Sequence, residues 1–281
     1  MTEQQSRSLS QARQLVRELR TFQQEASPPP ALRSRVLFQV GLADGYLRFS
    51  SPIGPVFVAL NARGISAVDY AADAASFEAR FRTEFGRAIF PLDPAEAPAW
   101  VGQIESALQT GQTAHLPFDL RGRSPFEQAV LCRTLLIPSG EVRPYAWVAR
   151  EIGQPHAVRA VGNALARNPI PLLIPCHRVV RSDCQIGNYS LGGPLNKRAL
   201  LEAEGIDLAL LEQLSARGVR YIGSTTTHVY CFPTCRYARR IAPEHRQPLR
   251  SPEEATRLGY RPCQHCRPAP PASPDISLAS E

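Results

Sequence analysis

Apolar residues recur along the chain with two different periods, and these divide it into helical and extended segments. Residues 8 to about 24 carry apolar positions at helical spacing between arginines, which predicts an amphipathic helix. The prolines at 28–30 end that pattern and indicate a linker. Three runs with strand character follow, at Val36 to Val40, Tyr46 to Phe49 and Val56 to Leu60. We therefore expect a small β-rich subdomain after a helical extension.

Two apolar stripes at helical spacing come after the predicted strands. Phe77, Phe81 and Phe85 lie four residues apart and predict a helix that packs on the sheet. A second stripe runs from Trp100 to Leu108 and predicts another helix. Stripes of this kind are typical of core positions rather than of cofactor sites.

A second, mostly helical unit begins at Ser124. A proline and a glutamate follow this serine at the N1 and N3 positions, which is the capping-box signature of a helix start. Further on, Tyr145 to Ile152 and His156 to Arg167 predict two short helices separated by a break at 153–155. This is the outline of a helix-turn-helix. The outline is common in helical proteins, so by itself it leaves DNA binding open.

The charge balance narrows the choice of partners. The chain has 32 Lys and Arg against 25 Asp and Glu, a formal net charge of +7 and a pI near 9.3. A basic chain often binds a polyanion through its phosphates, although a generically basic surface gives the same balance. The N-terminus has no apolar signal region, and no apolar run approaches the roughly 18 residues that a membrane span requires. We expect a cytoplasmic protein without a membrane partner.

The cysteines indicate metal binding or thiol chemistry rather than disulfides. There are seven, an odd number, and the last four form two close pairs: Cys132, Cys176, Cys184, Cys231, Cys235, Cys263 and Cys266. In a reducing compartment this pattern favours metal or catalytic thiols.

Cys176 has the neighbours of a reactive thiol. It precedes His177 and Arg178 between apolar residues, and positive neighbours lower a thiol pKa toward the nucleophilic thiolate. The alternative is a buried cysteine that packs as a small hydrophobe. Because adjacent side chains seldom point the same way, we expect His177 to act on Cys176 through a water, with a third group orienting the imidazole.

The sequence around Cys176 resembles the methylated-DNA protein-cysteine methyltransferases, also called O6-alkylguanine-DNA alkyltransferases, over about residues 50–205. Six motifs occur in order: Pro138-Ser139-Gly140-Glu141-Val142 leading to Tyr145, Arg159-Ala160-Val161-Gly162, Asn168-Pro169, Pro175-Cys176-His177-Arg178-Val179, Gly187-Asn188-Tyr189-Ser190, and Leu200-Leu201-Glu202-Ala203-Glu204-Gly205. The resemblance implies irreversible, single-turnover transfer of an alkyl group from O6-alkylguanine, and possible O4-alkylthymine repair, in double-stranded DNA.

The same resemblance assigns roles to individual residues. Cys176 would accept the alkyl group, His177 would draw its proton through a bridging water, and Glu204 would orient His177, a relay of the triad type. Asn168 would tie the active-site turn to the helix-turn-helix.

A stacked base is out of reach of the thiol, so it must be flipped out of the duplex. Arg159 would fill the gap that it leaves. Tyr145 would donate a hydrogen bond to the base, and the backbone N–H of Ser190 would help the leaving oxygen. Val179 and Arg178 complete the implied DNA-binding and base-binding set. Leu191 is an insertion relative to the usual family pattern and is expected to reshape the pocket wall.

The four paired cysteines fit a metal site. Cys231 and Cys235 form a C-x3-C pair, Cys263 and Cys266 form a C-x2-C pair, and four thiolates so spaced suit tetrahedral zinc, with four free thiols as the alternative. A unit of roughly 50 residues has too little core to fold unaided, which favours the metal.

Residues 218–268 resemble the metal-binding domain of the bacterial protein Ada. The resemblance rests on Thr226-Thr227, Tyr230-Cys231, Pro233, Cys235, Gly259-Tyr260-Arg261-Pro262-Cys263 and Cys266. In Ada the first cysteine takes a methyl group from a DNA phosphotriester, which makes Cys231 a candidate second acceptor. A purely structural or DNA-anchoring zinc module is the alternative. His228 stands where a glycine is usual, and Phe232 where an arginine is usual.

Together these features predict an α+β protein in five parts. We expect a helical extension and linker (1–34), a β-rich subdomain (35–115), an alkyltransferase domain with the helix-turn-helix (120–205), a zinc module (218–268) and a disordered tail (269–281). We expect a monomer. Two other readings are a non-catalytic sensor of alkylation damage, whose relatives lack the acceptor cysteine, and a cysteine hydrolase, for which no oxyanion arrangement is identifiable.

Overall fold

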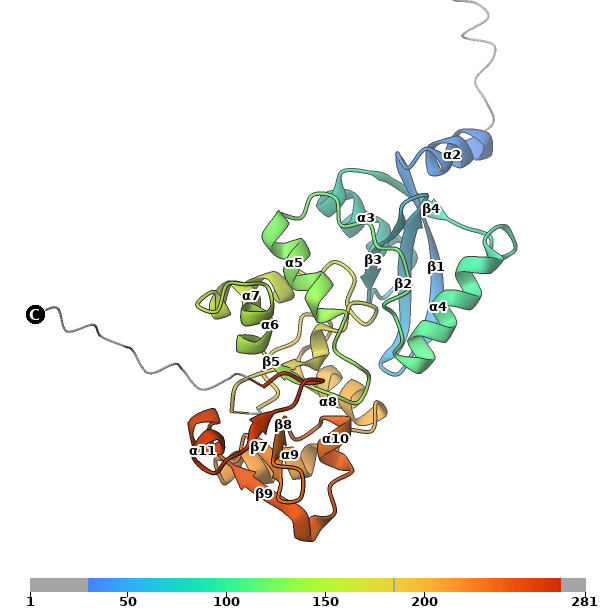
Figure 1. Ribbon diagram of the computed structural model, residues 1–281. Coiled ribbons are helices and arrows are strands. Elements are labelled where there is room, and N and C mark those ends of the chain that lie inside the picture. The colour runs from blue at the N-terminus through green and yellow to red at the C-terminus, as the bar shows by residue number, and fades with distance from the viewer. Residues whose placement is uncertain (1–29, 184, 269–281) are drawn as a thin grey trace, which may run out of the picture.

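A computed structural model of the chain describes residues 30–183 and 185–268 (Figure 1). The predicted N-terminal helix at 8–24 and the predicted tail at 269–281 lie outside the described residues, as does Cys184. Among the described helices, none combines the length and the apolar character needed to cross a bilayer. The mixed α+β class predicted from the sequence is confirmed.

The N-terminal unit is a four-stranded sheet with a helix on each face. Its elements are α2 (Pro30–Gln39), β1 (Ala43–Ser51), β2 (Gly54–Asn61), β3 (Gly64–Asp69), α3 (Ala74–Phe85), β4 (Ala88–Pro91), η1 (Pro94–Glu96) and α4 (Pro98–Thr110). The strand order is β3-β2-β1-β4, antiparallel except for the parallel pair β1–β4. Phe57 faces Phe77 of α3, whereas Val56 and Val58 join the cluster that contains Ile104 of α4. Alternation along β2 therefore separates two apolar faces.

In this unit one strand prediction is wrong, and the strands β3 and β4 were not predicted. Val36 to Val40 was predicted as a strand, but residues 30–39 form α2. A short apolar run cannot be assigned by period alone. In the fold both sides of β1 are already paired, with β2 and β4, which leaves no place beside β1 for the run. The helices predicted around Phe81 and Ile104 are confirmed as α3 and α4.

The central unit is mostly helical and contains the helix-turn-helix. Its elements are α5 (Pro125–Thr134), β5 (Arg143–Pro144), α6 (Tyr145–Glu151), α7 (Val158–Ala166), η2 (Cys176–Arg178), β6 (Val179–Val180), α8 (Gly193–Ala203) and α9 (Leu208–Ala216). The predicted capping box is present in full at the start of α5. The two helices of the predicted helix-turn-helix are α6 and α7, and β5 pairs in parallel with β6 beside them.

The C-terminal module is a second small sheet with short helices. Its elements are β7 (Tyr221–Ser224), β8 (Val229–Cys231), α10 (Arg236–Arg239), η3 (Pro243–His245), β9 (Arg246–Leu249), α11 (Pro252–Arg257) and β10 (Arg261–Pro262), with strand order β10-β8-β7-β9. In Figure 1 this module lies directly against the helical unit. One apolar cluster includes Trp147 and Leu173 of the central unit together with Tyr230 and Phe232 of the module, so their cores are continuous.

Candidate active site and candidate metal site

Cys176 lines a cavity next to the helix-turn-helix. The residue is 5% exposed and opens the short helix η2 rather than a strand. The cavity has a volume of about 490 Å³ and is lined by Tyr145, Gly162, Asn163, Leu165, Ala166, Cys176, Arg181, Gly187, Asn188, Tyr189 and Ser190. The thiol therefore shares one cavity with the first turn of α6, with α7 and with the 187–190 loop.

Asn168 fixes the turn that carries Cys176. Its Nδ2 lies 2.9 Å from the Ile174 carbonyl oxygen and 3.2 Å from Cys176 Sγ, and its Oδ1 accepts from the Ile170 N–H at 3.0 Å. One buried amide thus holds both ends of the loop between α7 and η2. Because Asn168 lies two residues after α7, these contacts link the turn to the end of the helix-turn-helix.

Glu204 contacts both basic residues that follow the thiol. Its Oε1 lies 2.9 Å from His177 Nε2, and Arg178 Nε donates to both carboxylate oxygens at 3.0 Å. Burial alone would raise the pKa of Glu204, but the hydrogen bonds and charges of His177 and Arg178 outweigh it and lower the pKa to about 2. Burial lowers the pKa of His177, and Glu204 only partly offsets this. The imidazole is therefore neutral at pH 7 and oriented by an ionised carboxylate.

Arg178, which was predicted to belong to the DNA-binding set, is buried and bonded within the protein. Its side chain is 2% exposed, and besides Glu204 it donates to the Ile137 carbonyl at 2.7 Å and to the Gly111 carbonyl at 3.0 Å. Gly111 has φ 67°, and a Cβ there would lie 2.6 Å from Arg178 Nη2. The guanidinium instead joins α4, α5 and α8, because a buried cation needs its donors satisfied.

Lys197 is a site residue that the sequence analysis missed. Its Nζ is fully buried and donates to the Val179 carbonyl at 2.6 Å and to the Asn188 carbonyl at 3.4 Å. Burial lowers the pKa of Lys197 to about 8, while Cys176 acts to raise it. A signal was available, since Lys197 is the only lysine among 32 basic residues and all the others are arginines.

The thiol itself is under opposing influences. Burial raises the pKa of Cys176, while the Asn168 amide, the Lys197 charge and a hydrogen bond from Ser190 act to lower it. The His177 Nδ1 atom is buried and has no hydrogen-bond partner among the described residues. An unpaired buried nitrogen of this kind is suited to pass a proton through a small mediator such as water.

The other predicted DNA-binding residues occupy different positions around the cavity. Tyr145 opens α6 and lines the cavity, and its pKa is raised by burial and then by the charge of Cys176. Ser190 lines it from the opposite loop, and Arg159 is exposed on α7. The Val179 side chain is fully buried and its carbonyl is engaged by Lys197. The inserted Leu191 is 7% exposed and lines a neighbouring cavity instead.

The four paired cysteines meet in the C-terminal module. Their sulfur atoms all lie within 4.8 Å of one another, and all four residues are buried. Cys231 ends β8, Cys235 immediately precedes α10, and Cys263 follows β10 with Cys266 three residues later. Four thiolates at about 2.3 Å from a tetrahedral ion would be about 3.8 Å apart, so the cluster fits a zinc ion with small adjustments.

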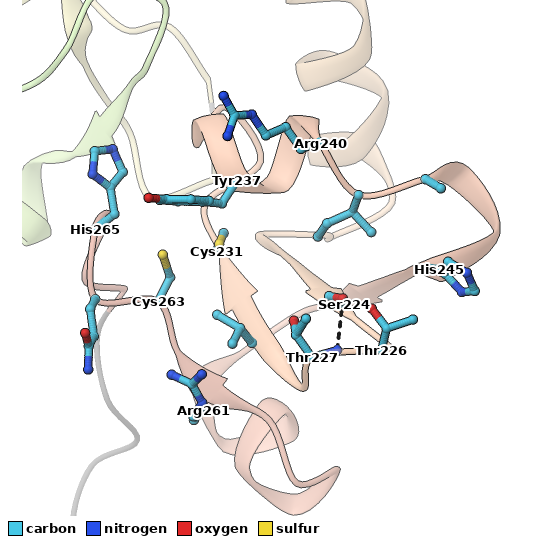
Figure 2. A pocket seen from close by; sticks show the side chains of 14 residues that line it. Ser224, Thr226, Thr227, Cys231, Tyr237, Arg240, His245, Arg261, Cys263 and His265 are labelled. Carbon is cyan, nitrogen blue, oxygen red and sulfur yellow. Dashed lines mark hydrogen bonds between the residues drawn. The ribbon is translucent and has the colours of Figure 1, made fainter.

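A second cavity, of about 660 Å³, opens onto this cluster (Figure 2). Cys231 and Cys263 line it, whereas Cys235 and Cys266 do not. Figure 2 shows Tyr237 lying across the cavity above these two sulfur atoms, with Arg240 and Arg261 at its edge. Two of the four cysteines can thus be approached from outside, and cations flank the approach.

The structure shows the surroundings of both departures from the Ada pattern. His228 has φ 52°, in the left-handed region that glycine adopts without strain, and its ring lies 5.5 Å from the ring of Tyr260. Phe232 is 7% exposed and packs on Tyr221 at 5.5 Å, inside the contact with the helical unit. Phe232 therefore contributes to packing rather than to anion binding.

Comparison with known proteins finds a matching family for the helical unit and another for the C-terminal module. The family described as 6-O-methylguanine DNA methyltransferase, DNA binding domain, matches residues 125–206, and the metal binding domain of Ada matches residues 210–269. A methylated-DNA–protein-cysteine methyltransferase from Mycobacterium bovis is 36% identical over 160 residues, which cover 57% of this chain and 91% of that protein. The chain belongs to the methylated-DNA–protein-cysteine methyltransferase family. Both resemblances predicted from the sequence are thereby confirmed.

Other methyltransferases match different shares of the chain. The protein of the same name from Rattus norvegicus is 47% identical over 100 residues, 35% of this chain and 46% of the rat protein, so the chain spans less than half of that relative. A crystal structure of the Mycobacterium tuberculosis O6-methylguanine methyltransferase has 35% sequence identity and a TM-score of 0.48, and covers 59% of this chain and 98% of that one.

Proposed function

We propose that this protein repairs alkylated DNA by transferring the alkyl group of O6-alkylguanine irreversibly to Cys176. The observation that carries the proposal is the constellation around the thiol. Cys176 is held by Asn168, and the neighbouring His177 is oriented by Glu204 at 2.9 Å. Membership of the methyltransferase family supports the same reaction.

The proposed chemistry is a displacement at the alkyl carbon. Cys176 Sγ forms a bond to that carbon as the carbon–O6 bond breaks, and the electron pair of the broken bond stays with the guanine. The thiol proton passes through a water to His177 Nδ1, and the guanine takes up a proton and leaves neutral. The product on the protein is a thioether, which is neither a good leaving group nor an acid. Each molecule therefore reacts once.

The same residues suggest how the base is presented. The target must leave the stack to reach a buried thiol that lines a cavity. Arg159 is exposed on α7, where it can enter the gap left by the flipped base. Tyr145 and Ser190 line the cavity that would receive it and can donate hydrogen bonds to its ring and oxygen. Duplex DNA containing an alkylated base is the proposed partner, and O4-alkylthymine is a second candidate substrate.

Mass spectrometry of the protein after incubation with an O6-methylguanine duplex tests this proposal. We expect one added methyl group per molecule on the peptide that carries Cys176, and none in Cys176→Ala. A protein that binds this duplex but stays unmodified would instead be a damage sensor, the alternative function. Turnover of an ester or amide substrate without a stable adduct would indicate a hydrolase.

We further propose that Cys231, Cys235, Cys263 and Cys266 hold a zinc ion, which the Ada match and the sulfur cluster support. The ion would keep the four thiols as thiolates. Cys231 is proposed as a second methyl acceptor, for DNA phosphotriesters, because it borders the cavity that Arg240 and Arg261 flank. Methylating one thiolate makes the site less negative by one charge, which would reduce repulsion from DNA phosphates.

A duplex carrying one methyl phosphotriester and no base lesion tests the second acceptor. We expect a methyl group on the Cys231 peptide. Modification of Cys263, which borders the same cavity, would reassign the acceptor. No modification at either residue, with zinc bound, would leave the module a structural or DNA-anchoring role.

A further inference from the structure

Residues 140–151, here called the bridging segment, contact both the candidate metal module and the candidate active site. The segment consists of the loop before β5, the short strand β5 and the helix α6. It lies where the module meets the helical unit in Figure 1.

The first half of the bridging segment is bonded to the residues around the cysteine cluster. The Val142 N–H donates to Thr234 Oγ1 at 2.9 Å, one residue before Cys235. Glu141 Oε1 accepts from the Arg236 N–H at 3.0 Å and lies 3.1 Å from His265 Nε2. Glu141 is 1% exposed, so its carboxylate is shielded from water. The segment thus closes directly over both cysteine pairs.

The second half of the segment is hydrogen-bonded to Cys266, the last of the four cysteines. Trp147 Nε1 donates to the carbonyl oxygen of Cys266 at 3.0 Å, in a fully buried contact. The Arg143 guanidinium lies 5.8 Å from the Trp147 ring and 5.4 Å from the Phe232 ring, between the two units. Phe232, which stands where the Ada pattern has an arginine, therefore makes an interunit contact. This substitution adapts the module to the surface on which it packs.

The same segment reaches the catalytic residues from its other side. The Gly140 N–H donates to Glu204 Oε2 at 3.4 Å, and Arg143 pairs with Val179, whose carbonyl holds Lys197. Tyr145, the first residue of α6, lines the cavity of Cys176. Twelve consecutive residues therefore join the cysteine cluster to the carboxylate, the cation and the wall of the alkyl-transfer site.

We propose that the metal module is a positioning element for base repair, and that it holds the bridging segment in the conformation that completes the Cys176 pocket. The inference rests on the proposed transfer to Cys176. A small module that depends on a metal presents Thr234 and Cys266 at fixed positions only when it is folded. Loss of these contacts frees β5 and α6, so Tyr145 and Glu204 lose their support and transfer slows.

Two conservative substitutions test the proposal in the full-length, zinc-loaded protein. Thr234→Val removes the hydroxyl that meets Val142 while keeping the shape, and Trp147→Phe removes the indole N–H that meets Cys266. The matched controls are Thr256→Val, an exposed position on α11, and Trp100→Phe, on α4. The measurement is the single-turnover rate constant of methyl transfer to Cys176 at saturating duplex.

We expect Thr234→Val and Trp147→Phe each to lower the rate constant by about tenfold, the factor that corresponds to about 1.4 kcal/mol, and the controls to match the unsubstituted protein. Hydrogen–deuterium exchange provides the readout besides activity. Amides of residues 140–151 should exchange faster in the two variants and after zinc chelation, while bound zinc, measured directly, stays stoichiometric in the variants.

The outcomes separate this proposal from the proposed function. If the unsubstituted protein transfers methyl to Cys176 but neither variant nor chelation changes the rate or the exchange of residues 140–151, the module is only appended and the inference is wrong. If the unsubstituted protein transfers nothing, the proposed function fails, and exchange alone then decides whether the module supports the segment.

Discussion

The charges buried around Cys176 act on the thiol in different ways. Arg178 is engaged with Glu204 and two backbone carbonyls, so its charge is largely neutralised within η2 and α8. In the described part of the chain, Lys197 donates to two carbonyl oxygens, those of Val179 and Asn188, and its charge acts on Cys176. The cation that favours the Cys176 thiolate is thus Lys197 on α8, and not Arg178, although Arg178 is closer in sequence.

Lys197→Met should slow alkyl transfer without weakening DNA binding. Lys197 is buried and still charged at pH 7, since its pKa is about 8. Removing that charge raises the pKa of Cys176, and each unit of change makes transfer of the thiol proton to His177 about tenfold less favourable. We expect the transfer rate constant at pH 7 to fall by about tenfold, measured by quenched single-turnover reactions.

Arg198→Met is the control for this experiment. Arg198 is the next residue on α8, and its guanidinium is paired with Glu212 at the surface. Its removal should leave the rate unchanged. Equal rates for Lys197→Met and the unsubstituted protein would show that the Lys197 charge does not assist the transfer.

The pH dependence of transfer should report His177. Burial places the pKa of His177 below its usual 6.5, so the imidazole is neutral at pH 7 and can accept a proton. As the pH falls through that lowered pKa, His177 becomes protonated and loses this capacity. Glu204, with a pKa of about 2, stays ionised throughout.

We therefore expect a transfer rate that is steady down to pH 6.5 and declines only below it, measured on a duplex at saturating protein. The groups facing His177 are Glu204, Arg178, Lys197 and the Tyr189 ring, whose centroid lies 6.1 Å away. The shifted pKa values of Glu204, Lys197 and Tyr189 all lie outside the range from pH 5 to 6.5. A decline with its midpoint above pH 6.5 would mean that the imidazole gains rather than loses basicity in the fold.

Single elements were predictable where one local signal decided the conformation. The capping box at Ser124 and the phenylalanine stripe of α3 have that property, and both are present. The run at 36–40 was mispredicted because its conformation depends on whether a neighbouring strand has a free edge. That is a property of the whole sheet. The contacts of Lys197 and of the bridging segment join residues that are far apart in the chain. No rule based on residue spacing predicts them.

The capping box makes a quantitative prediction for α5. Ser124 accepts from the Glu127 N–H at 3.3 Å, and Glu127 accepts from the Ser124 N–H at 2.9 Å. Ser124→Ala leaves an amide of the first turn without its partner and should lower the free energy of unfolding by about 1 kcal/mol, measured by urea titration. Ser106→Ala, an exposed position inside α4, should change it little. An equal loss in both variants would argue against a capping effect.

At the scale of the whole molecule, the arrangement of the apolar clusters indicates how the protein unfolds. One cluster contains residues of β1 and β2, the helical unit and the metal module, including Val58, Trp147 and Tyr230. The face of the sheet covered by α3 forms a separate cluster around Phe57 and Phe77. Because the module shares its core with the helical unit, neither can lose structure without exposing apolar surface of the other.

Differential scanning calorimetry of the zinc-loaded and the chelated protein tests whether the module and the helical unit unfold together. Zinc at 100 times its dissociation constant stabilises the folded state by about 2.7 kcal/mol, reduced by any binding to the unfolded chain. At about 2–4 °C per kcal/mol for a chain of this size, chelation should lower the main transition by about 5–10 °C. A main transition that stays in place while a smaller one disappears would mean that the module melts alone. The bridging contacts would then be too weak to couple the metal to the core that surrounds Cys176.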